Sequence, residues 1–308
     1  MIKRLTAADF EEAFGEPLSQ FVKDKIAACD LSYHTLDTHE RDNVIMSIMN
    51  TLSSSEVKKS GAHRINDWIY GWGQNRDEFA QTSHFQSLVP KYFGKFPYVR
   101  WQQDFIRPVN RSFEYNTVKI LQYWIFEKHF ANLSNVHEFG CGTGHNLFRV
   151  QEVNDTAAVA GLDWASSSQD NIKKINEVYN KNFGCHNFDF FNVDTEYNMG
   201  DNSGAYTFAA LEQVGGSHTE FLNYLVSQKP SVCVHIEPIG EMLNPEHNFV
   251  DYLSVQYFKK RNYLDGFMRT LHDMQAQGTI EIIQQQRSYV GSLFVDGYSV
   301  VAWRPKNA

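Results

Sequence analysis

Apolar and polar positions alternate in blocks along the C-terminal part of the chain. From residue 136 onward, short apolar runs typical of buried strands are separated by amphipathic segments with helical spacing. Strands that alternate with helices of about ten to fifteen residues indicate a parallel sheet with crossover helices. The last two apolar runs, 279–291 and 297–305, flank a short turn, which predicts a hairpin and an antiparallel last strand. The pattern therefore predicts an α/β fold with a mostly parallel sheet.

The first hundred residues follow a different pattern. Residues 7–30 and 40–52 place apolar side chains at helical spacing, whereas 87–116 are rich in aromatic residues and contain three prolines. We expect helices in the first two segments and an ordered irregular structure in the third. The chain is thus predicted to consist of an N-terminal, mainly helical region at 1–115, which could cover the sheet as a lid, and a second domain at 116–308.

Three glycines follow the first apolar run, in the segment E-F-G-C-G-T-G at 138–144. A backbone this bare is typical of a cofactor-binding loop, although a tight turn without a ligand would also favour glycine. A phosphate-binding P-loop would need a lysine directly after the glycines, and none is present. The dinucleotide motif G-x-G-x-x-G would need a glycine at a position held by His145 or Leu147. Both alternatives are therefore disfavoured.

With these residues in view, the sequence resembles the class I S-adenosylmethionine-dependent methyltransferases. The resemblance rests on the glycine segment, on Asp163 in G-L-D-W, and on Asp189 in F-D-F-F. It covers about residues 130–308. It implies a Rossmann-like seven-stranded sheet, mostly parallel with an antiparallel terminal hairpin strand, and S-adenosyl-L-methionine as the cofactor.

The resemblance also implies roles for individual residues. Asp163 would accept hydrogen bonds from the ribose hydroxyls, as the acid after the glycine loop does in nicotinamide sites. Asp189 would lie near the adenine amino group, with Asp194 as the alternative, and Glu138 would organise the loop or reach the cofactor's amino group. Asp163 could instead simply cap the helix that starts near Ser166. The full set assigned to the cofactor is Glu138, Gly140, Cys141, Gly142, Gly144, Asp163, Trp164, Asp189, Phe190, Leu211, Glu212 and Arg100.

Arg100 is the one member of this set that lies upstream of the glycine loop. It stands among aromatic residues, about forty positions before the loop. A guanidinium could pair with the carboxylate at the methionine end of the cofactor in a bidentate way. The alternative is a surface arginine or one in an internal salt bridge.

The candidate catalytic residues are His235 and Glu237, at the end of the fifth strand of the alternating region. Side chains alternate across a strand, so these two share one face. Either could act as a base for an acceptor that must lose a proton. The structural alternative is a core histidine and a structural carboxylate. Together with His247 they could also hold a divalent ion that chelates a diol, although no metal is expected.

Composition and charge narrow the choice of partners. The formal net charge is -8 and no basic run of five or more occurs, which argues against nucleic acid as a partner. The four cysteines form no C-x-x-C pair, and no stretch of eighteen apolar residues occurs. We therefore expect a soluble, cytoplasmic protein without a membrane association. The sequence is also compatible with a homodimer.

The sequence thus predicts a methyltransferase that acts on an oxygen or nitrogen nucleophile of a small-molecule acceptor, polar and conceivably carbohydrate-like. Two alternatives stay open. One is a catalytically silent relative that binds the cofactor, or nothing, and acts as an interaction module. The other is a nicotinamide-dependent oxidoreductase, disfavoured because His145 interrupts the dinucleotide motif and no Tyr-x-x-x-Lys site is evident.

Overall fold

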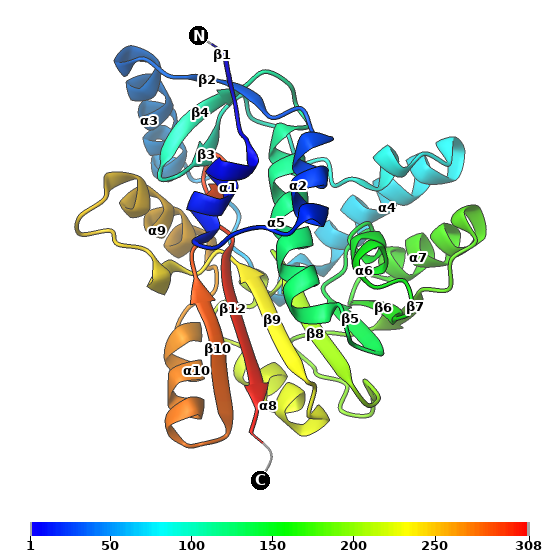
Figure 1. Cartoon of the computed structure of the whole chain (residues 1–308). Helices are drawn as coiled ribbons and strands as arrows, with labels where there is room; N and C mark the ends of the chain where they lie inside the picture. The colour runs from blue at the N-terminus through cyan, green and yellow to red at the C-terminus, as the bar shows by residue number, and fades with distance from the viewer. Residues whose placement is uncertain (1, 307–308) are drawn as a thin grey trace.

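The computed structural model describes residues 2–306 and contains a large and a small β-sheet (Figure 1). The strands of the large sheet are β5 (Asn135–Phe139), β6 (Ala158–Asp163), β7 (Gly184–Asn187), β8 (Ser203–Phe208), β9 (Val232–Glu237), β10 (Ile280–Gln286) and β12 (Ser299–Pro305). Their order is β10-β12-β9-β8-β5-β6-β7. Strands β5 to β9 pair in parallel, and β12 pairs antiparallel with both β9 and β10. The predicted seven-stranded α/β sheet is confirmed.

Helices cover both faces of this sheet. They are α5 (Phe113–Phe130), α6 (Leu147–Val153), α7 (Ser166–Tyr179), α8 (Thr219–Gln228), α9 (Phe249–Arg261) and α10 (Phe267–Ala276). Strand alternation divides the apolar side chains between two cores. Val234 and Ile236 of β9 pack with α5 in one core, whereas Cys233 packs with α8 and α10 in the other. Figure 1 shows α5 on one side of the sheet and α8 and α10 on the other.

The N-terminal region contains the predicted helices. They are α1 (Ala7–Phe14), α2 (Gln20–Ala27), α3 (Thr38–Ser53) and α4 (Ile65–Thr82), with short 3-10 helices η1 (Ala62–Arg64) and η2 (Phe85–Leu88). Two further 3-10 helices, η3 (Leu211–Val214) and η4 (Gly240–Met242), follow β8 and β9. Asp37 and Glu40 form a reciprocal capping box that fixes the start of α3. Helix α4 packs on α7, where Asn171 Nδ2 donates to the Trp72 carbonyl at 3.2 Å.

The small sheet was not expected from the sequence. Its strands are β1 (Ile2–Arg4), β2 (Ser32–Thr35), β3 (Val99–Trp101), β4 (Asp104–Pro108) and β11 (Val290–Gly291), in the order β1-β2-β4-β3-β11. The prediction of irregular structure across 87–116 is therefore wrong at the β3–β4 hairpin. Gln102 and Gln103 both take positive φ, +48° and +64°, as a tight two-residue hairpin turn requires. Those positions favour asparagine and glycine, so the sequence lacks the usual hairpin signal.

Strand β11 joins the two parts of the chain. It lies between β10 and β12 in sequence but pairs antiparallel with β3 of the small sheet. The segment 287–298 therefore leaves the large sheet, adds a strand to the small sheet and returns. No helix within residues 2–306 has the length and apolar character needed to cross a membrane.

Candidate functional site

Three adjoining cavities follow the carboxyl ends of the parallel strands, at the side of the sheet that the N-terminal region covers. The strand-end cavity is lined by residues that follow β5, β6 and β7, namely Gly140, Asp163, Trp164, Phe188, Asp189 and Phe190. The glycine-loop cavity is lined by residues 140–143. The third, here called the chamber, has a volume of about 390 Å³ and is lined in part by Glu212. Trp68 and Ala209 line all three cavities, which therefore form one continuous cleft.

The glycine loop brings bare backbone to the cleft. The amides of Gly140 and Cys141 both donate to the Leu162 carbonyl, at 2.7 and 3.0 Å, which ties the loop to β6. Gly140 has a φ of +79°, and a Cβ there would lie 2.3 Å from the Cβ of Ala210. Gly142 has a φ of +55°, and a Cβ there would approach the Trp72 ring to 3.0 Å. Only glycine fits both positions without displacing neighbours.

Asp163 connects this loop to the next helix. Its Oδ2 accepts from the Gly142 amide and its Oδ1 from the Ala165 amide, both at 2.8 Å. Burial raises the pKa of the carboxyl to about 6, while these hydrogen bonds act in the opposite direction. The carboxylate also lines the strand-end cavity. Because each oxygen can accept more than one hydrogen bond, it both holds the backbone and faces the cavity.

Two acids were candidates for the adenine end of the site, and the structure separates them. Asp189 lines the strand-end cavity beside Phe190, and its Oδ1 accepts from the Phe191 amide at 2.8 Å. Asp194 instead accepts from His186 Nε2 at 2.8 Å and is not among the residues that line the cavity. Only Asp189 is therefore placed to meet a ligand there.

Other predicted residues lie beneath the cleft rather than in its wall. Glu138 is buried, its Oε1 accepts from Asn146 Nδ2 at 2.7 Å, and burial raises its pKa to about 8. It therefore organises the loop. Cys141 contributes backbone to the glycine-loop cavity, while its buried thiol packs against Gly161. Leu211 is part of the core beneath η3.

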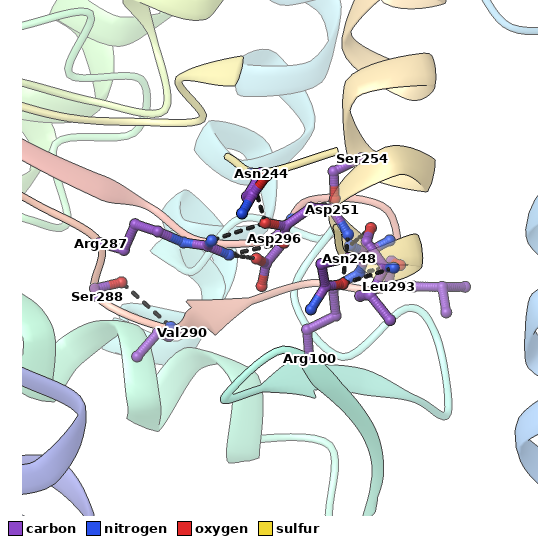
Figure 2. Close-up of polar contacts among 11 residues, drawn as sticks. Arg100, Asn244, Asn248, Asp251, Ser254, Arg287, Ser288, Val290, Leu293 and Asp296 are labelled. Carbon is purple, nitrogen blue, oxygen red and sulfur yellow. Dashed lines mark hydrogen bonds and ion pairs between the residues drawn. The ribbon is translucent and has the colours of Figure 1, made fainter. Parts of the chain in front are cut away.

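Arg100 lies away from the cleft, in a buried polar cluster shown in Figure 2. Its guanidinium donates to the Leu293 carbonyl at 3.1 Å, to the Val250 carbonyl at 2.8 Å and to the Ser254 hydroxyl. Burial lowers its pKa to about 10. The structure thus does not bring Arg100 to the cofactor residues. It connects β3 to α9 and to the segment 287–298.

Glu237 and His235 share a strand face as predicted, but neither is among the residues that line the three cavities. Glu237 accepts from the amides of Ala210, Leu211 and Glu212, all at 3.1 Å, so it fixes the start of η3. His235 lies between aromatic rings, and its Nδ1 pairs with Thr207 Oγ1 at 3.0 Å. Burial lowers the pKa of His235 to about 3, which keeps it neutral. This is the arrangement of a core histidine and a structural carboxylate.

Glu212 is the acid that does face the chamber. Its Oε1 accepts from Gln213 Nε2 at 2.7 Å, and its pKa is raised to about 8 by burial and by the charge of Glu237. Across the chamber, Glu114 accepts from the Gly94 amide at 2.9 Å, and burial raises its pKa to about 7. The chamber therefore holds two carboxyl groups that exchange protons near neutral pH.

The N-terminal region supplies cleft residues that the sequence did not reveal. Trp68 and Trp72 lie one turn apart on α4 with ring centroids 5.3 Å apart, and both line the strand-end and glycine-loop cavities. Tyr92 lines the glycine-loop cavity and the chamber. The only signal was the tryptophan pair at helical spacing, which a buried helix contact would equally explain. Within residues 2–306, no group of three or more His, Cys, Asp or Glu side chains could hold a metal ion, and this includes His235, Glu237 and His247.

The sheet order decides the fold class at this point. The glycine loop follows β5 at the centre of the sheet, the second and third strands extend to one side, and the terminal hairpin closes the other. The chain has the fold of the class I methyltransferases. No protein-family model matches it, and no curated protein matches it.

Three solved structures illustrate the similarity in fold. A plantazolicin methyltransferase in complex with SAH is 12% identical, with a TM-score of 0.42 over 80% of this chain and 98% of its own. An O-methyltransferase from neocarzinostatin biosynthesis is 13% identical, with a TM-score of 0.42 over 98% of this chain and 90% of its own. The magnesium protoporphyrin IX methyltransferase of Synechocystis PCC 6803 is 11% identical, with a TM-score of 0.43 over 63% and 83%. Similarity at this level says nothing about the substrate of this chain.

Proposed function

We propose that this protein is an S-adenosylmethionine-dependent methyltransferase that acts on an oxygen or nitrogen nucleophile of a small polar acceptor. The observation that supports this most strongly is the division of the cleft. Bare glycine backbone, Asp163 and Asp189 line two connected cavities, and these open past Trp68 and Ala209 into a separate chamber with titratable acids. A methyl donor and an acceptor need two such adjoining spaces.

The strand-end cavity has the chemistry that an adenosine requires. Asp163 offers acceptor oxygens for a pair of ribose hydroxyls, and Asp189 offers one for an exocyclic amine. Phe190 and Trp164 supply apolar surface for a flat base. The glycine-loop cavity beside it offers main chain rather than side chains, so an amino-acid tail can lie against the backbone. These residues fit the proposed cofactor.

S-adenosylmethionine supplies an electrophilic methyl group when it is bound. The protein must then align the acceptor and exclude water, because the donor is already reactive. Proton removal is the remaining task, and we assign it to Glu212 rather than to Glu237 or His235. Glu212 faces the chamber, and a pKa of about 8 makes it a proton acceptor near neutral pH. The latter two are enclosed by backbone and aromatic neighbours.

Thermal unfolding with and without ligand tests the proposal. We expect S-adenosylhomocysteine at about 100 times its Kd to stabilise the native state by about 2.7 kcal/mol. Asp163→Ala should abolish this shift, while Asp194→Ala, a matched aspartate outside the cavity, should keep it. NAD should give no shift.

Each other outcome has a definite meaning. Stabilisation by NAD alone would favour the oxidoreductase alternative. No shift with either ligand would contradict the proposal. Binding of S-adenosylhomocysteine without release of that product from S-adenosylmethionine, across a broad set of acceptors, would favour a catalytically silent binding protein.

A further inference from the structure

The chamber is an aromatic enclosure of a size suited to a small molecule. Its volume of about 390 Å³ falls within the range of ligand pockets, roughly 300–1,000 Å³. Rings come from all sides of it, from α4, the 92–96 segment, α9 and the 292–298 segment. Those that the argument uses are Trp68, Phe96, Tyr257, Tyr263 and Phe294. Such walls favour a flat, apolar body, because aromatic faces pair best with other rings.

Three cationic side chains also line the chamber, Arg64, Lys95 and Arg261. The two arginines are held in place: Arg64 Nε donates to Asp67 Oδ2 at 3.1 Å, and Arg261 Nη1 donates to the Lys58 carbonyl at 2.6 Å. Their guanidinium carbons lie 5.2 Å from the centroid of the Trp68 ring and 5.1 Å from that of Tyr263, respectively. They are therefore oriented before any ligand arrives, which lowers the entropy cost of binding.

Each of these guanidiniums keeps an unused donor. Arg64 Nη1 and Arg261 Nε are buried and have no hydrogen-bond partner within residues 2–306. A buried donor without a partner costs free energy, so such donors are usually satisfied by a ligand or by water. Burial raises the pKa of Tyr257, and the positive charges of Arg64 and Arg261 oppose that rise, so both guanidiniums act on the same place.

The carboxyl groups of the chamber decide the sign of the ligand's charge. A cationic acceptor would need ionised carboxylates, but burial raises the pKa of Glu114 to about 7 and that of Glu212 to about 8. At neutral pH both groups are substantially protonated, whereas the three cations keep their charge. The chamber is therefore positive overall and suited to an anion.

We propose that the acceptor is a small aromatic compound with a carboxylate or similar anionic group, which Arg64 and Arg261 bind while Glu212 faces the nucleophile. This inference rests on the proposed function and names the substrate class of the same site. Guanidinium and carboxylate groups match in geometry, since the planar fork of donors can engage both oxygens. The ring of the acceptor would lie against Trp68 and Tyr257.

Binding of matched probes tests this class. The probes are 4-hydroxybenzoate, 4-hydroxybenzamide and tyramine, which share a phenol and differ in charge. Their affinities are measured by calorimetry in the presence of saturating S-adenosylhomocysteine. We expect the acid to bind at least tenfold more tightly than the amide, and tyramine to bind more weakly still. In Arg64→Met and Arg261→Met the preference for the acid should fall at least fivefold, whereas Arg304→Met, an exposed arginine on β12, should retain it.

The outcomes separate this inference from the proposed function. Equal affinity for acid and amide, tighter binding of tyramine, or no binding of 4-hydroxybenzoate in a protein that binds S-adenosylhomocysteine would overturn the aromatic anion while leaving the methyltransferase proposal in place. Tight binding of the acid by a protein that does not bind S-adenosylhomocysteine would do the reverse. A variant that loses the shift with S-adenosylhomocysteine is misfolded. In that case the conservative Arg64→Lys and Arg261→Lys variants, which keep the charge but lose the fork, replace it and should show an intermediate preference; an unchanged preference in both would also overturn the proposal.

Discussion

Two neighbouring glutamates show how local environment separates similar residues. Glu237 accepts three backbone hydrogen bonds at the start of η3, whereas Glu212, whose amide makes one of them, directs its side chain to the chamber. The charge of Glu237 also raises the pKa of Glu212. One acid therefore builds the loop, and the other is left with an exchangeable proton where an acceptor would lie.

The role of Glu212 leads to a prediction about pH. A base acts in its deprotonated form, so turnover by the wild-type protein should rise with pH and level off above about 8, the raised pKa of Glu212. Glu212→Gln should lower kcat by about 10²–10⁴-fold and remove this rise. Initial rates of S-adenosylhomocysteine release between pH 6 and 9.5, with an acceptor from the binding assay, measure both effects.

The control for that experiment is Glu114→Gln, which removes the other acid of the chamber. It should leave the alkaline rise in place. Calorimetry should show that both variants bind S-adenosylhomocysteine like the wild type. If Glu212→Gln kept the wild-type rate and pH profile, Glu212 would not be the proton acceptor.

Sequence reasoning at this scale worked for residues whose role depends on their local chain. The glycine loop, Asp163 and Asp189 lie directly after strands, so alternation and loop position were enough to place them at one edge of the sheet. Alternation also placed His235 and Glu237 on one face, but not which neighbours that face would meet. That depends on packing between distant segments.

At the scale of elements, a buried ion-pair cluster joins α9 to the segment 287–298 (Figure 2). Arg287 donates to both oxygens of Asp251 at 2.8 Å and also to Asp296. Both aspartates are fully or almost fully buried, and Asp251 also accepts from the Asn244 amide at 2.8 Å. Both joined elements line the chamber, so the cluster fixes one wall of it.

Removing one partner of this cluster should be costly. Arg287→Met would leave two buried carboxyl groups without their cation, and we expect the free energy of unfolding to fall by about 3–5 kcal/mol. Urea unfolding measures this. The matched surface pair is Arg304 with Glu281, where Arg304→Met should cost less than about 1 kcal/mol. A loss below 1 kcal/mol for Arg287→Met would show that the cluster does not hold these elements together.

The elements that the sequence failed to predict share a physical cause. Strand β11 has two residues and β3 has three, and both are strands only because they pair with each other. Helix α9 supplies chamber residues, yet its basic end at 259–261 reads as a solvated face until Arg261 is seen to contact the Lys58 carbonyl. Long amphipathic helices and buried parallel strands, in contrast, have a periodicity of their own.

At the scale of the whole molecule, the cleft is formed by segments from both ends of the chain. The large sheet supplies the glycine loop and the acids, while α4 supplies Trp68 and Trp72, and 292–298 closes the chamber. The division into 1–115 and 116–308 stays a prediction, and β11 shows that the second part also contributes a strand to the small sheet. The composition could indicate a large core but not this interlocking.

Hydrogen exchange of the whole protein with and without S-adenosylhomocysteine tests the central claim most directly, because it locates the ligand as well as detecting it. We predict slower amide exchange in peptides that cover 139–146, 163–166 and 187–191, and in α4 at Trp68 and Trp72, with little change in β1 and β2. No protection anywhere, or protection confined to segments outside the cleft, would contradict the assignment of this cleft to a methyl donor.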